Sequence, residues 1–86
     1  MPTSPKLTAV QRTVLLDARA GHVYRSERGH DLYTCYDRAQ GNKKVTASVN
    51  RLSTLGLLRI GEQNGLQRSW HVTAQGDRAL SREDLT

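Results

Sequence analysis

Apolar residues recur at helical spacing near the start of the chain, and they predict a first helix over residues 9–20. Thr8 and Gln11 have the spacing of a capping box, in which each side chain pairs with an otherwise unpaired backbone amide. Gly21 can adopt the left-handed conformation that ends a helix. Four residues are expected on the buried stripe of this helix: Val10, Val14, Leu15 and Ala18.

A second amphipathic segment predicts a helix over residues 43–55. Asn42 precedes this segment as a candidate N-cap, and Gly56 follows it as a stop signal. Three apolar residues project to one side and are expected in the core: Val45, Val49 and Leu52.

The segment between these two helices carries β-forming residues. Residues 22–26 and 32–36 flank a turn-like stretch over residues 27–30, which predicts a short hairpin or an irregular strand pair. Residues 37–41 have no apolar periodicity and are interpreted as a connector.

A β-hairpin is predicted directly after the second helix. Residues 57–60 and 67–72 have the character of strands, and the pair Asn64 and Gly65 is a strong signal for the turn between them. Thr73 can then cap a short final helix over residues 74–81.

A chain of 86 residues has room for one domain with one modest core. Hydrophobic residues make up 36% of the chain and charged residues 24%, a composition that supports folding. Residues 1–6 contain both prolines and are expected to form a flexible arm. The domain is then expected over residues 7–81, followed by a polar tail over residues 82–86.

Targeting and membrane signals are missing from the sequence. No apolar run approaches the roughly 18 residues needed to span a bilayer, and the first six residues lack the apolar stretch of a signal peptide. Cys35 is the single cysteine, so no internal disulfide can form. We therefore expect a cytoplasmic protein with no membrane partner.

Positive charge is concentrated in the second helix and the hairpin that follows it. The formal net charge is +5, from 13 basic and 8 acidic residues. Residues 43–72 hold five of the basic residues against Glu62 alone, whereas residues 73–86 have a slight acidic excess. A local excess of this kind suits phosphate groups, although a solubilising surface has the same appearance.

Two stretches of the chain resemble a known family of DNA-binding proteins. The sequence over residues 45–57, with its exit Leu55, Gly56 and Leu57, resembles the recognition helix of winged-helix regulators. The sequence over residues 70–80 is similar to the end of the wing and the following helix of MarR-type repressors.

This resemblance implies an α+β winged helix-turn-helix fold, with a three-helix core, a C-terminal β-hairpin wing and a short final helix. The chain departs from MarR-type proteins because it has no room for their long dimerisation helices. Their ligand pocket and dimer mode therefore do not carry over. The usual second helix of the motif is not recognisable over residues 21–41, so a compact version is expected there.

The outer side of the second helix is the candidate for reading base edges. Arginine can bind guanine through two hydrogen bonds and asparagine can bind adenine in the same way, so Arg51 and Asn50 fit these roles. At 100° per residue, five residues lie opposite the buried side: Lys43, Ala47, Asn50, Arg51 and Thr54.

Phosphate contacts are expected at the start of this helix and on the hairpin. Cations, hydroxyls and the helix dipole all favour a phosphate near the helix start, where four candidates lie: Lys43, Lys44, Thr46 and Ser48. On the hairpin, polar residues flank or line a loop that suits the DNA backbone or the minor groove, against the opposing charge of Glu62. These hairpin candidates are Arg59, Asn64, Gln67 and Arg68.

Other polar and aromatic residues are interpreted as structural. Trp70 is expected to pack in the core, and the tyrosines of the middle segment are expected to cover it with their hydroxyls in water. These tyrosines are Tyr24, Tyr33 and Tyr36. Three arginines of the same segment, Arg25, Arg28 and Arg38, are expected to pair with Glu27, Asp31 and Asp37 rather than to extend the basic surface.

These features predict sequence-specific binding of double-stranded DNA by a small transcriptional or replicon regulator. The helix over residues 43–55 is expected in the major groove and the wing over residues 57–72 on the backbone or in the minor groove. Because one helix reads only a few base pairs, a homodimer is expected. The alternative is a protein-interaction module, an anti-repressor or assembly adaptor, that uses the same basic face.

Catalysis, cofactors and effectors are not indicated. No nucleophile with its base and no glycine-rich phosphate loop is present, so we expect no enzyme activity and no cofactor. The three histidines and Cys35 lack the close spacing of structural zinc sites, so no metal is expected. A further hypothesis is a sensor in which oxidation or metal binding at Cys35, near His30, releases DNA.

Overall fold

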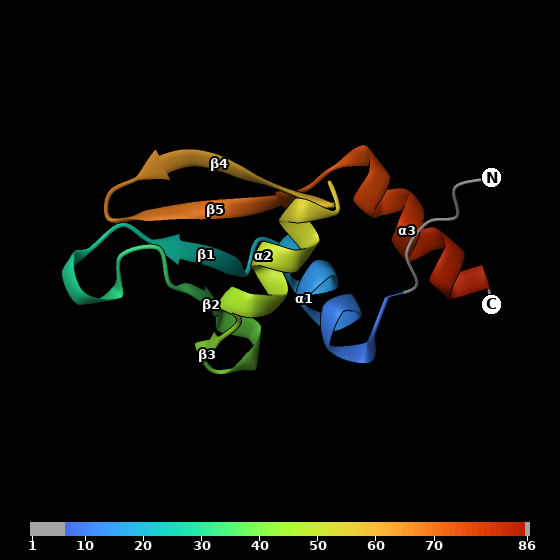
Figure 1. Ribbon diagram of the computed structural model, residues 1–86, viewed down its shortest axis with the longest axis horizontal. Helices are drawn as coiled ribbons and strands as arrows, with labels where there is room; N and C mark the ends of the chain where they lie inside the picture. Colours follow the sequence, from blue (N-terminus) through green and yellow to red (C-terminus); the bar gives the residue numbers. More distant parts are fainter. Residues whose placement is uncertain (1–6, 86) are drawn as a thin grey trace.

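A computed structural model of the chain describes residues 7–85 and folds them into three helices and one five-stranded antiparallel sheet (Figure 1). The helices are α1 (Ala9–Arg19), α2 (Thr46–Thr54) and α3 (Ala74–Leu85). The strands are β1 (Val23–Ser26), β2 (Cys35–Asp37), β3 (Lys43–Lys44), β4 (Leu58–Asn64) and β5 (Gln67–Val72). Two single 3₁₀ turns, η1 (Gly29–Asp31) and η2 (Arg38–Gln40), flank β2. The expected arm over residues 1–6 lies outside the described residues.

The first helix begins as its capping box predicts. The Thr8 hydroxyl accepts a hydrogen bond from the Gln11 amide at 3.1 Å, and the Gln11 side chain accepts one from the Thr8 amide at 3.0 Å. The expected core residues Val14, Leu15 and Ala18 are buried. Val10 is instead 55% exposed, because it lies at the edge of the stripe and Leu7 covers that end of the core.

The expected winged helix-turn-helix fold is wrong. The chain is an α+β protein, but its sheet has the order β3-β2-β1-β5-β4, and the segment between α1 and α2 forms strands instead of the second helix of a three-helix core. Within that segment β1 and β2 pair with each other, as the β-forming residues predict, with Tyr24 opposite Tyr36. On its other side β1 pairs with β5, so the two hairpins form one sheet rather than a core with an appended wing.

The second helix starts three residues later than expected. Lys43 and Lys44 pair with β2 as strand β3, and the Val45 amide donates to the carbonyl of Cys35 at 2.9 Å. Asn42 has a φ of 60°, a left-handed conformation unlike that of an N-cap residue, so it does not cap α2. The backbone groups of Lys43, Lys44 and Val45 take part in the pairing with β2, so they are not available to extend the helix.

The second hairpin forms as predicted, with its turn displaced by one residue. Asn64 and Gln67 face each other across the strands, so the two-residue turn is Gly65 and Leu66. Gly65 has a φ of 64°, which glycine adopts at the first turn position without steric cost. A bulge between Ile60 and Gln63 shifts the register within β4.

The final helix begins at the predicted position and continues beyond the predicted end. The Thr73 hydroxyl accepts a hydrogen bond from the Gly76 amide at 3.1 Å and donates one to the carbonyl of Gly56 at 2.7 Å. α3 runs to Leu85, so residues 82–85, expected to belong to the polar tail, are helical.

One hydrophobic core joins the helices to one face of the sheet. Trp70 is 6% exposed and packs in this core, as predicted. The bulkiest fully buried apolar side chains come from α1, β1, α2 and α3: Leu15, Leu52, Leu80, Val14, Val23 and Val49. No helix among residues 7–85 is both long enough and apolar enough to cross a membrane.

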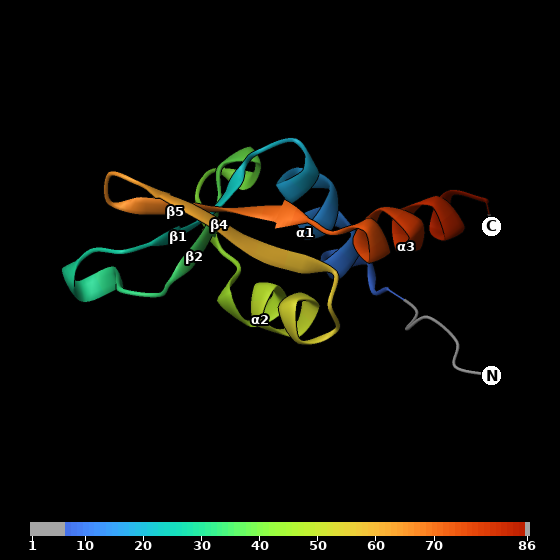
Figure 2. The ribbon, with the colours of Figure 1, turned by 90° about the horizontal axis from the view of Figure 1, so that it is seen from above.

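Side-chain alternation gives the sheet two different faces. Val23, Cys35 and Trp70 are buried on the face that contributes to the core, which we call the core face. The residues next to them in sequence, Tyr24 and Tyr36, therefore point to the opposite side, which we call the open face. In Figure 2 α2 lies on one side of the sheet, and the green η2 turn lies on the other.

Gly76 provides a test of how closely α3 packs against the chain entering β4. An added Cβ atom would lie 2.6 Å from the Val72 Cγ1 atom and even closer to the carbonyl oxygen of Leu57. We expect Gly76→Ala to lower the free energy of unfolding by about 1–3 kcal/mol through overpacking, although alanine favours a helix by about 1 kcal/mol. Urea unfolding of this variant and of Gln75→Ala, at an exposed neighbouring position, measures the effect. A stabilised Gly76→Ala variant would contradict the packing.

Candidate nucleic-acid interface

α2 leaves a continuous stripe of its surface exposed to solvent. Val49 and Leu52 are buried on its inner side, and no acidic residue occurs in the helix. The Thr54 hydroxyl donates to the backbone carbonyl of Asn50 at 2.9 Å, so this hydrogen bond does not involve the Asn50 side chain. Four of the predicted base-reading residues lie together on this stripe: Ala47, Asn50, Arg51 and Thr54.

The residues predicted to bind phosphates at the helix start do not all lie together in the structure. Lys43 and Lys44 are exposed on β3, at the edge of the sheet and ahead of the helix. The Thr46 hydroxyl accepts a hydrogen bond from the Cys35 amide at 3.0 Å, so it serves the junction between α2 and β2. Ser48 is only partly exposed.

The hairpin residues predicted for the same interface point to different faces of the sheet. Arg68 precedes Ser69, whose partner is Tyr24, and follows Gln67, so it lies on the core face between two residues of the open face. Arg59 pairs with His71, and both point away from the core face. The predicted DNA-binding residues therefore form two surfaces rather than one, because strand alternation separates neighbours that a loop would keep together.

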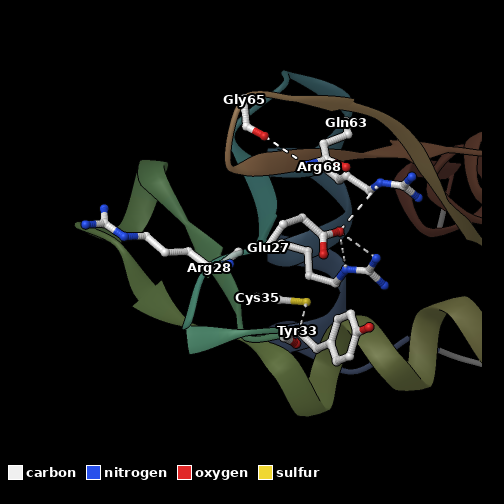
Figure 3. A network of polar contacts seen from close by, with 9 residues as sticks. Glu27, Arg28, Tyr33, Cys35, Gln63, Gly65 and Arg68 are labelled. Carbon is white, nitrogen blue, oxygen red and sulfur yellow. Dashed lines mark hydrogen bonds and ion pairs between the residues drawn. The ribbon is translucent and has the colours of Figure 1, made fainter. Parts of the chain in front are cut away.

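Two arginines and one glutamate form a cluster on the core face, where the end of β1 pairs with the start of β5 (Figure 3). Arg25 donates to Glu27 Oε1 from Nη2 at 2.7 Å and from Nε at 3.2 Å, as the predicted pairing of these residues requires. Arg68 Nε lies 3.5 Å from the same carboxylate oxygen. The Arg25 guanidinium also lies 4.8 Å from the centre of the Tyr33 ring, on a side chain that is 59% exposed.

Glu27 has a clear electrostatic role in this cluster. Arg25 and Arg68 are register partners on adjacent strands, and like charges directly opposite each other destabilise a sheet. The glutamate between them removes this repulsion, and the three side chains retain a net charge of +1. The sequence pointed to the pair Arg25 and Glu27, but the contribution of Arg68 depends on the long-range pairing of β1 with β5.

The open face carries a second group of aromatic and polar residues. The rings of Tyr24 and Tyr36 lie 5.5 Å apart between centroids, and the Arg38 guanidinium lies 4.6 Å from the centre of the Tyr24 ring. Arg38 also donates a hydrogen bond to the Gln67 side chain. These residues border or line a hollow of about 530 Å³, which the sequence reasoning did not predict.

Arg38 does not form the predicted pair with Asp37. Asp37 is fully buried, and its carboxylate accepts hydrogen bonds from the Ala39 amide at 2.9 Å and from the Gln40 side chain at 2.7 Å. These bonds hold the η2 turn, from which Arg38 reaches the open face. Arg28 is exposed and lines the hollow, while the side chain of its predicted partner Asp31 lies outside what the structure describes.

Cys35 lacks the features of a reactive thiol. It is 1% exposed, and burial raises the pKa of its thiol, an effect that Trp70 and Arg25 only partly oppose. Because the thiolate is the reactive form, this environment disfavours the hypothesis of an oxidation sensor. Within the described part of the chain, no three histidine, cysteine, aspartate or glutamate side chains gather in a way that would hold a metal ion.

Asp17 and Asp37 form a pair of neighbouring carboxyl groups under the η2 turn. Burial, followed by the hydrogen bond and the charge of Asp37, raises the pKa of Asp17 from 3.8 to about 6, while His22 and Gln40 act in the opposite direction. The second carboxylate oxygen of Asp17 is buried without a hydrogen-bond partner among the described residues. The proton that Asp17 retains therefore lies beside the fully buried Asp37 carboxylate, while Asp17 itself is partly exposed.

Comparison with known proteins adds no relative to this description: no family model, curated protein or solved structure matches the chain.

The carboxyl pair makes stability depend on pH in a defined direction. Because the folded-state pKa of Asp17 lies above its ordinary value of 3.8, the contribution of its proton to stability is fully present below about pH 3.8 and is lost as the pH rises through about 6. Asp17→Asn keeps a neutral donor beside Asp37. We expect this variant to gain stability relative to the wild type as the pH rises from about 4 to about 6, and to unfold a few degrees higher near pH 7.5, as measured by thermal melting.

A melting difference between Asp17→Asn and the wild type that stays constant from about pH 4 to pH 7.5 would contradict the raised pKa of Asp17. Asp77→Asn is the matched control, since its carboxylate is exposed at the surface and lies 4.0 Å from Arg19. This control is expected to show no comparable change across the same pH interval.

Proposed function

We propose that this protein binds double-stranded DNA and reads its sequence with the exposed stripe of α2. The observation that carries the proposal is the composition of that stripe, in which Asn50 and Arg51 are neighbours in sequence and both exposed, on a helix without acidic residues. The Arg51 guanidinium offers the two donors that guanine can accept from in the major groove, and the Asn50 amide offers the donor and acceptor that adenine requires. An α-helix with its side chains is about 10–12 Å across, which fits a groove about 12 Å wide.

Charge on the same side of the protein supports this orientation. Cys35 is the register partner of Arg25 and donates its amide proton to Thr46 at the start of α2. The Arg25 and Arg68 cluster therefore lies next to the N-terminus of α2 and on the same face of the sheet. Two guanidiniums with one compensating carboxylate can hold a phosphate of the strand that flanks the groove.

The proposal includes a role in transcriptional or replicon control, which a sequence-specific DNA-binding protein can serve. It also includes a homodimer, in which two copies of α2 lie on successive turns of the duplex. A single stripe of four residues contacts only a few base pairs, which is too short a site for useful selectivity. The same basic stripe on an acidic protein partner is the alternative, and DNA-binding measurements separate the two.

Substitutions on α2 and on β3 are expected to have different effects on DNA binding. Arg51→Ala removes a base contact and should weaken the preferred duplex about tenfold while leaving random duplex little changed. Lys43→Ala removes a phosphate contact and should weaken all duplexes similarly, with a salt dependence shallower by about one unit of slope. Selection from a randomised duplex pool defines the preferred site, and fluorescence anisotropy at several salt concentrations measures both effects.

Arg19→Ala is the charge-matched control for these variants, because Arg19 lies in α1, where it faces Asp77. Equal losses for Arg51→Ala on preferred and random duplexes would remove base reading from α2. A wild-type protein that binds no duplex even at low salt would favour the protein-partner alternative.

The molar mass of the free protein and of its DNA complex tests whether the protein is a dimer. Light scattering of the free protein and of its complex with the selected duplex should give two chains per complex, and the selected site should contain two half-sites about 10 base pairs apart. A complex with one chain per duplex and a single uninterrupted site would contradict the dimer.

A further inference from the structure

The open face of the sheet carries a stacking surface that faces away from α2. Tyr24 and Tyr36 lie on neighbouring strands with their rings 5.5 Å apart and tilted by 31°. The Arg38 guanidinium lies over the Tyr24 ring, with 4.6 Å between its central carbon and the ring centre. Planar guanidinium groups and aromatic rings are the two kinds of side chain on which unpaired bases stack.

Three contacts hold Arg38 in this position. Its guanidinium packs on Tyr24 and donates to the Gln67 side chain on β5, so it is held over one face of the ring. Its backbone belongs to the η2 turn, which the buried Asp37 carboxylate holds through the Ala39 amide. The Arg38 residue is nevertheless exposed, so it presents a pre-oriented planar group to solvent. A group ordered in advance loses little conformational entropy on binding.

The surroundings of this group match a single nucleic-acid strand in charge and in polarity. The hollow of about 530 Å³ beside it has no acidic residue in its lining, and the side-chain amides of Asn42, Asn64 and Gln67 can pair with base edges. Lys44 shares this face as the register partner of Tyr36. Arg59 lies on the same face at the opposite edge of the sheet. Five strands span about 19 Å, so Lys44 and Arg59 lie far enough apart to contact the phosphates of more than one nucleotide.

We propose that the open face binds single-stranded DNA by stacking a base on the Arg38 and Tyr24 pair. A duplex cannot stack on this pair, because the faces of its bases are already stacked on one another, and a duplex on α2 lies on the opposite side of the sheet. The site thus goes beyond the proposed function as a second, strand-selective surface. The choice of DNA rather than RNA as the bound strand rests on the proposed function of duplex-DNA binding. The stacking site itself does not depend on that function.

Fluorescence anisotropy with labelled strands of equal length tests this proposal. The probes are an oligothymidine strand, an abasic deoxyribose strand of the same charge, the corresponding oligouridine strand and a random duplex. We expect the oligothymidine strand to bind about tenfold more tightly than the abasic strand, because stacking adds to a charge contribution that both share.

Three variants assign the effect to this site. Arg38→Ala should weaken oligothymidine binding about tenfold and leave duplex binding unchanged. Arg38→Lys keeps the charge but loses the planar group, so it should resemble Arg38→Ala. Arg51→Ala should leave oligothymidine binding unchanged, and Arg19→Ala is the control for the loss of one positive charge. Circular dichroism establishes that each variant is folded before its binding is compared.

Equal affinity for the oligothymidine and abasic strands would overturn the stacking site, as would an Arg38→Ala variant no weaker than Arg19→Ala. An oligouridine strand bound tenfold more tightly than oligothymidine would overturn the choice of DNA. Loss of duplex binding in the wild type, with strand binding and its Arg38 dependence intact, would remove the proposed function and leave the strand site standing.

Discussion

The pairing of β1 with β5 is the interaction on which the rest of the molecule depends. It joins a hairpin from the first half of the chain to a hairpin from the second half, through register pairs such as Tyr24 with Ser69. This pairing closes one sheet, and its pleat determines which side chains face the helices. Val23 thereby enters the core while Tyr24 faces solvent, and Arg25 is brought opposite Arg68. The Arg25 and Arg68 cluster and the open face around Tyr24 both depend on this register.

Local patterns predicted the local elements well. The capping box at Thr8, the turn signal at Gly65 and the cap at Thr73 each act within a few residues, and each was found at or next to its predicted place. The β-forming residues of the middle segment likewise predicted the strand pair of β1 with β2. The winged-helix expectation came instead from resemblance over residues 43–80, and it failed where that resemblance ended.

Long-range pairing explains what the sequence could not show. The start of α2 moved from Lys43 to Thr46 because β3 pairs with β2, and no local feature of Asn42 or Lys43 encodes this pairing. The candidate site was divided for the same reason. Helical periodicity correctly grouped Asn50 with Arg51, whereas Arg59 and Arg68 were grouped by nearness in sequence and lie on opposite faces of the sheet. The Arg38 and Tyr24 pair was missed because its parts come together only across η2, β1 and β5.

An NMR titration of the ¹⁵N-labelled protein with its selected duplex most directly tests the proposal that the stripe of α2 recognises duplex DNA. The largest amide shift changes are expected at Ala47, Asn50, Arg51 and Thr54, with the amides of Tyr24 and Ser69 on the open face unaffected. Changes confined to the open face, or distributed evenly over the sheet and helices, would contradict it.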